Sequence, residues 1–146
     1  MSRSCASPIL HISYWDFFKQ YYTPLLKEVD LVLKAIESSI SIKETAKALA
    51  LKPEVVEDIM AKENIEAIDR EGFLRIMMHG SSSLCRLMQR ECMCGSPDLY
   101  SPAHIAYIYG LQGRHVAAVC RANGYTEVPS QALPELLSKI YVFIMR

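Results

Sequence analysis

Apolar residues recur every three or four positions through most of the chain, which is the spacing of one face of an α-helix. The first such stripe begins after Ser13, which can cap a helix, and continues to Ile36. Pro24 lies inside this stretch and is expected to kink the helix or to start a new one, because proline cannot donate a hydrogen bond to the preceding turn. Residues 1–12 show little periodicity and are expected to form a loose arm.

Shorter helical patterns follow, and turn-forming residues separate them from one another. They lie in residues 41–65, 66–80, 81–88 and 101–125. The last segment, 130–146, is very apolar and poor in charge, and we expect it to form a C-terminal helix, although Tyr141 to Met145 also suits a strand. No other run alternates convincingly as a strand does. The pattern therefore predicts an all-α fold, with one compact multi-helix domain over residues 1–146.

The segments 41–65 and 101–125 share one pattern at an offset of sixty residues. A small residue stands where two crossing helices would touch, another small residue opens the turn, and apolar residues follow on the inner face of the second helix. The aligned pairs are Ala46 and Ala106, Ala50 and Gly110, Leu51 and Leu111, Val56 and Val116, and Ile59 and Val119. Each segment begins with a serine that can cap its first helix, Ser41 or Ser101. The sequence therefore predicts the same helical unit twice.

Both segments resemble the motif of the helix-turn-helix DNA-binding superfamily, in which the second helix lies in a groove of the duplex. The resemblance covers residues 41–65 and 101–125 and extends to the superfamily pattern alone. It implies two helix-turn-helix-like units and a role in DNA binding and transcription regulation.

The two segments differ in the charge on the outward face of their second helix. The first carries Glu54, Glu57 and Asp58 there, which would face a duplex with one negative charge per about 1.7 Å of its axis. The second carries glutamine and arginine, which make paired hydrogen bonds to adenine and guanine edges, together with other polar residues. Its candidate DNA-binding residues are Gln112, Arg114, His115, Arg121 and Asn123. We therefore expect the second unit to contact DNA; an ordinary solvated arginine face, with Ala117 and Ala118 packed on a neighbouring helix, is equally consistent with the pattern.

Charge is distributed unevenly along the chain. The totals balance, with 16 lysines and arginines against 16 acids, which argues mildly against a protein that coats nucleic acid. Residues 72–126 nevertheless hold five arginines against two acids, so an anionic partner is expected there. The leading hypothesis is a small DNA-binding regulator that forms a homodimer through its apolar last segment. The alternative is a protein–protein adaptor that uses the same scaffold without DNA and binds a partner at the acidic first unit.

Cysteine and histidine supply the candidates for a metal site. Zinc or an iron–sulfur cluster would use Cys85, Cys92 and Cys94, with His79 or His104 as a fourth ligand. The cysteine spacing differs from the usual paired CxxC, and the neighbouring arginines would also suit a redox-sensing thiol. We expect neither a metal site nor another cofactor.

Several functional classes are not expected from the sequence. It contains neither an arranged nucleophile and base nor a glycine-rich phosphate loop, so we do not expect an enzyme. No window of eighteen apolar residues would span a membrane. The start lacks the pattern of a signal peptide, and an odd count of five cysteines fits reduced thiols, so a cytoplasmic location is expected.

Overall fold

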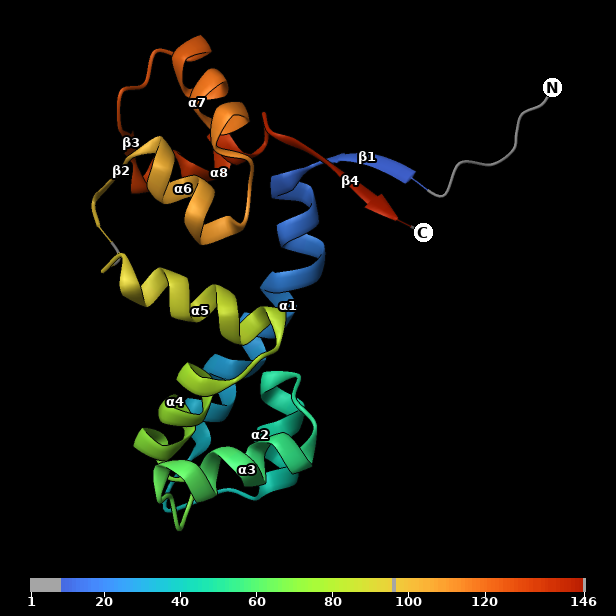
Figure 1. Ribbon diagram of the computed structural model, residues 1–146, viewed down its shortest axis with the longest axis vertical. Coiled ribbons are helices and arrows are strands. Elements are labelled where there is room, and N and C mark those ends of the chain that lie inside the picture. The colour runs from blue at the N-terminus through green and yellow to red at the C-terminus, as the bar shows by residue number, and fades with distance from the viewer. Residues whose placement is uncertain (1–8, 96, 146) are drawn as a thin grey trace, which may run out of the picture. The chain divides into compact units, whose positions relative to one another are not determined.

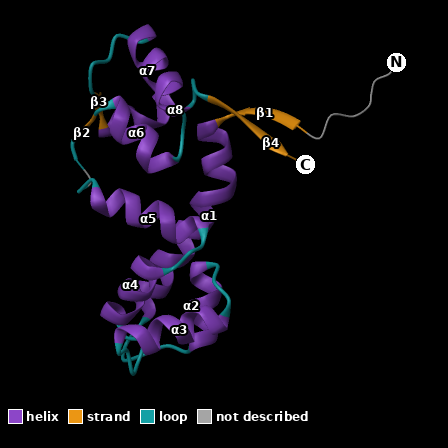
Figure 2. Cartoon of the chain, in the orientation of Figure 1, coloured by secondary structure: helices purple, strands orange, loops and turns teal. Residues whose placement is uncertain are grey.

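The computed structural model describes residues 9–95 and 97–145 and confirms an all-α fold (Figures 1 and 2). The helices of the described residues are α1 (Tyr14–Ala35), α2 (Ile42–Leu49), α3 (Pro53–Glu63), α4 (Arg70–His79), α5 (Ser83–Met93), α6 (Pro102–Tyr109), α7 (Gly113–Ala122) and α8 (Leu133–Leu137), with a 3-10 turn, η1 (Ser130–Ala132). The strands are β1 (Ile9–Ser13), β2 (Leu99–Tyr100), β3 (Val128–Pro129) and β4 (Tyr141–Met145). None of the helices that the structure describes is long and apolar enough to cross a membrane.

Contacts between residues group the chain into two compact units. Unit 2 is continuous and covers residues 22–96, whereas unit 1 combines residues 1–21 with residues 97–146. The predicted helix-turn-helix segments fall one in each unit. The single domain predicted for residues 1–146 stays a prediction.

Unit 2 contains most of α1 and the helices α2 to α5. Helix α1 continues through Pro24 without a break, so the predicted alternative that a new helix starts there is wrong, while the predicted kink stays a prediction. Helix α2 begins with the expected capping box, in which the Glu44 amide donates to Ser41 Oγ at 3.1 Å and the Ser41 amide donates to Glu44 Oε1 at 3.5 Å. The core of this unit is formed by fully buried side chains, Leu49, Val56, Ile68, Phe73, Ile76 and Leu84.

Unit 1 packs the start of α1 against α6, and α8 completes its core. The ring of Tyr109 meets the rings of Tyr14 and Phe18 edge-on, at centroid distances of 5.6 and 5.9 Å. The fully buried side chains of the unit are Ile105, Ile108, Val116, Leu136, Leu137 and Ile140. Two short antiparallel pairs, β2 with β3 and β1 with β4, are its only sheets within the described residues.

The predicted C-terminal helix over residues 130–146 is wrong. The segment instead forms η1, the short helix α8 and the strand β4. Helix α8 ends at Leu137, whose carbonyl accepts a hydrogen bond from the Ile140 amide. The aromatic and β-branched residues that follow favour an extended chain. A partner strand is supplied by β1, so the predicted loose arm is also wrong for residues 9–12, while residues 1–8 lie outside the described residues.

Candidate nucleic-acid interface

The two predicted helix-turn-helix units share the backbone geometry of the turn and of the start of the second helix, at an offset of sixty residues. The turn after the first helix is closed by a hydrogen bond of 2.9 Å in each, from the Leu51 amide to the Ala46 carbonyl and from the Leu111 amide to the Ala106 carbonyl. The second helices begin sixty residues apart, at Pro53 and at Gly113. The core valines of these helices, Val56 and Val116, are both completely buried. The repeated sequence pattern therefore corresponds to a repeated local structure.

The turns themselves show why the pattern needs a small residue. Ala50 and Gly110 end their helices in the left-handed region, with φ of 56° and 66°. Glycine adopts this region freely, whereas a residue with a Cβ pays a steric penalty there. Ala50 therefore retains backbone strain that Gly110 avoids.

The amino end of α7 is open to an anion. Five other helices have a side-chain oxygen that accepts a bond from an amide in the first turn; these caps are Ser13, Ser41, Asp69, Ser82 and Ser101. Gln112 stands at the same position of α7 and makes no such bond. The first amides of an α-helix have no partner within the helix, and the helix dipole adds a partial positive charge at this end. Arg114, in the first turn, adds a full positive charge.

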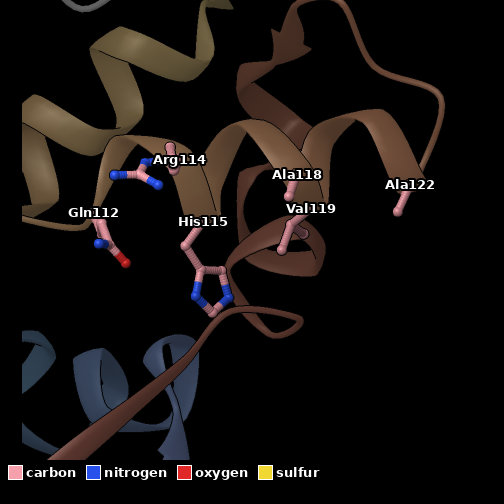
Figure 3. Close-up of a pocket in the computed structure, with 6 residues that line it drawn as sticks. All are labelled: Gln112, Arg114, His115, Ala118, Val119 and Ala122. Atoms are coloured by element: carbon pink, nitrogen blue, oxygen red, sulfur yellow. The ribbon is translucent and has the colours of Figure 1, made fainter.

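The exposed face of α7 is polar or cationic and contains no carboxylate. Gln112, Arg114, His115 and Arg121 are exposed, and Ala118 lies among them as a small exposed residue. An open hollow of about 460 Å³ is lined by residues of this helix and its cap, namely Gln112, Arg114, His115, Ala118, Val119 and Ala122 (Figure 3). No salt bridge engages Arg114 or Arg121 within the described residues. The exposed face of α7 therefore carries positive charge that no salt bridge of the described residues neutralises, and the alanine between the arginines keeps this face low.

His115 lies at the border of a second hollow in the same unit. This hollow has a volume of about 280 Å³ and is lined by Gly110, Leu111, Gln112, His115, Ile140, Tyr141 and Val142. In Figure 3 the imidazole ring extends from α7 away from Arg114. His115 is thus accessible, but it faces the segment that leads into β4 as well as the open side of α7.

Asn123 differs from the other four predicted site residues because its side chain is engaged within the protein. Its amide nitrogen donates to the Val119 carbonyl at 2.8 Å, and its amide oxygen accepts from Lys139 Nζ at 2.6 Å. Lys139 also pairs with Glu135 at 3.6 Å. Asn123 ends α7, as the sequence predicted, and its hydrogen bonds make it a structural residue. No pattern in the sequence indicates the contact with Lys139, which lies sixteen residues away along the chain.

Helix α3 presents the opposite charge on the equivalent surface. Glu54, Glu57 and Asp58 are all exposed, as the pattern predicted. Its amino end also lacks a side-chain cap, but Glu54 already places a carboxylate in the first turn. This helix therefore suits a cationic partner and not a phosphate backbone.

The structure does not bring the three candidate metal ligands together. Cys85 and Cys92 lie seven residues apart on α5, which separates them by about 10 Å along the helix axis. Cys85 is fully buried, with its Sγ 3.8 Å from the Leu49 carbonyl, whereas Cys92 is exposed and Cys94 half-buried. Burial raises the pKa of the Cys85 thiol and that of Cys120, so both favour the neutral form. No group of three metal-binding side chains occurs among the described residues.

No family model, no curated protein and no solved structure matches the chain.

Proposed function

We propose that the α6–α7 unit binds DNA, with α7 lying in the major groove, and that the chain acts as a small transcriptional regulator. The observation that carries this proposal is the exposed face of α7, which joins an uncapped amino end to Arg114 and Arg121 and has no carboxylate. The major groove admits one α-helix, and the amino-terminal residues of a second helix are those that reach base edges.

The positions on α7 divide the contacts into two kinds. Gln112 and Arg114 lie at the amino end, where a groove-bound helix meets the bases, so we assign them to base contact. Arg121 lies two turns further along, about 10 Å from Arg114 along the axis, and we assign it to a phosphate. Ala118, between them, leaves the helix able to approach the duplex closely.

A titration of the protein with duplex DNA at low and at physiological salt tests the proposal. Binding should weaken steeply as salt rises, because association releases cations from the phosphates and a more concentrated salt solution reduces the entropy gained by that release. Arg114→Gln should reduce affinity, whereas the matched substitution Arg86→Gln, at an exposed arginine of unit 2, should leave it unchanged. Failure to bind at low salt, or equal effects of both substitutions, would contradict the proposal.

A second candidate function rests on the acidic face of α3. Its three exposed carboxylates form a surface on which a basic protein segment can dock, and the α2–α3 unit would then serve as an adaptor. If α7 shows no affinity for DNA while Glu57→Gln weakens capture of a basic peptide, the adaptor function replaces the regulator.

A further inference from the structure

Strands β1 and β4 form an antiparallel ribbon that has open edges. Ile9 pairs with Met145, His11 with Phe143, and Ser13 with Tyr141. No third strand joins this ribbon within the described residues, so each strand has one edge that no other described strand covers. Figure 1 shows the ribbon extending away from helices α6, α7 and α8 of the same unit.

The base of the ribbon is fixed to the core of unit 1. The amide of Tyr14, directly after β1, donates to the carbonyl of Ile140, directly before β4, at 2.6 Å. Ser13 and Ile140 are both buried, and Ser13 Oγ accepts a bond from the Asp16 amide at 3.2 Å as α1 begins. This anchorage sets the register of the two strands, so the open edges have a defined geometry.

The composition of the ribbon is unusual for a strand pair with open edges. Eight of its ten residues are apolar, the other two are His11 and Ser13, and none carries a formal charge at neutral pH or is a proline. Proteins usually protect open edges with charged residues, proline or a covering segment. An isolated two-stranded ribbon is also marginally stable in water, and further strands stabilise it. The ribbon therefore has the chemistry of an interior strand pair.

We propose that this ribbon pairs edge to edge with the ribbon of a second copy of the chain, forming a four-stranded sheet across a two-fold axis. An antiparallel pairing of one strand with its own copy is self-complementary, as a two-fold interface requires. The partner must be an uncharged strand of about equal length, and a second copy supplies one. The ribbon has no lysine or arginine, so it does not suit a phosphate backbone.

The proposed dimer does not depend on DNA binding. If the chain both dimerises and binds DNA, the dimer extends the proposed function. Two copies related by a two-fold axis present two α7 helices, and a regulator of this kind binds two half-sites. The sequence predicted a homodimer through an apolar helix; the structure assigns the same role to a strand edge.

Sedimentation in the absence of DNA tests the pairing. The parent should sediment as a dimer at micromolar concentration, twice the mass of the 16.5 kDa chain. Ile144→Lys introduces a charged residue into β4 and should give a monomer that keeps its helical circular dichroism. The matched control is Leu31→Lys, at an exposed leucine of unit 2, which should remain dimeric. A monomeric parent, or a dimer abolished only by Leu31→Lys, overturns the proposal, as does a monomer that instead binds neutral lipid vesicles.

Cross-linking tests the geometry without relying on a destabilising change. In a background with serine at Cys5, Cys92 and Cys94, single cysteines are introduced as His11→Cys or Phe143→Cys, at the middle of each strand. Oxidation should link two chains in at least one of these variants, and the variant identifies which edge pairs. Ala118→Cys, on the exposed face of α7, is the control and should not cross-link. Cross-linking at Ala118→Cys alone contradicts ribbon pairing even if the parent dimerises.

Discussion

Arg114 occupies in α7 the position that Glu54 occupies in α3, because each is the second residue of its helix and the helices begin sixty residues apart. The two helices share their preceding turn and their buried valine, yet they place opposite charges beside an amino end that has no side-chain cap. The charge at this position governs what can approach the helix, since the amino end itself attracts anions in both. The same turn and helix therefore favour an anionic partner in unit 1 and a cationic partner in unit 2.

Arg121 and Asn123 should separate DNA contact from stability. Arg121→Ala should lower the slope of log affinity against log salt by about one unit, because a phosphate contact is lost. Asn123→Ala should leave that slope unchanged but reduce the free energy of unfolding by about 1 kcal/mol, because the bonds to Val119 and Lys139 are removed. Salt-dependent titrations and urea unfolding measure the two effects, and an unchanged slope in Arg121→Ala would contradict the assignment.

Glu57→Gln should leave the sequence preference of DNA binding unchanged. Its carboxylate lies on α3, which we assign no role in DNA contact, so its removal acts only through the long-range field. A small rise in affinity for non-specific DNA at low salt is expected. Competition between specific and non-specific duplexes measures the preference, and a change in preference would show that α3 also contacts DNA.

The two turn residues should respond to exchange in opposite directions. Ala50→Gly should stabilise the protein by about 0.5–1 kcal/mol, because relief of left-handed strain exceeds the added flexibility of the unfolded chain. Gly110→Ala should destabilise it by a similar amount; a Cβ at this position would meet no atom within 4 Å, so the cost lies in the backbone alone. Urea unfolding of the two single variants is the measurement, and shifts of the same sign would contradict the strain argument.

The buried thiols should make stability fall as the solution becomes alkaline. Burial raises the pKa of Cys85 and Cys120 in the folded protein above the ordinary value of 9.0. Below pH 9.0 both states keep these protons; above it the unfolded chain releases them first, so the unfolded state is favoured as pH rises. Urea midpoints between pH 7 and 10 measure the loss.

Two thiol variants provide the comparison, because other groups also titrate in this range. Cys120→Ala should show a smaller alkaline loss than the parent, whereas Cys92→Ser, at an exposed thiol, should show the same loss. An alkylating reagent at neutral pH should modify Cys92 before Cys85 and Cys120. An equal alkaline loss in all three proteins would show that burial of the thiols does not contribute.

Local signals in the sequence predicted several helix boundaries. Ser41, Ser101, Pro53 and Asn123 mark helix ends through their own backbone or side-chain chemistry, and the structure places each where it was expected. The exposed charges of α3 and α7 followed from the same helical spacing.

Features that depend on distant partners were missed. The strand β4 is ambiguous by itself, and its pairing with β1 joins residues from opposite ends of the chain. Asparagine is a residue type that can contact DNA bases, so the sequence alone favours that role for Asn123. Only the structure shows that its side-chain oxygen accepts a hydrogen bond from Lys139. Neither contact can be inferred from the spacing of residues within one helix.

The pairing of Ile9 with Met145 also sets an order of events during synthesis. Unit 2 is continuous in the sequence and can fold as soon as its last helix has been made, whereas unit 1 needs residues from both ends. At a synthesis rate of about 5–20 residues per second, β4 is made on the order of ten seconds after β1. During that interval every nascent chain carries an uncharged strand β1 that has not yet paired with β4. Premature association between chains is therefore expected mainly on polysomes, where several nascent copies lie close together.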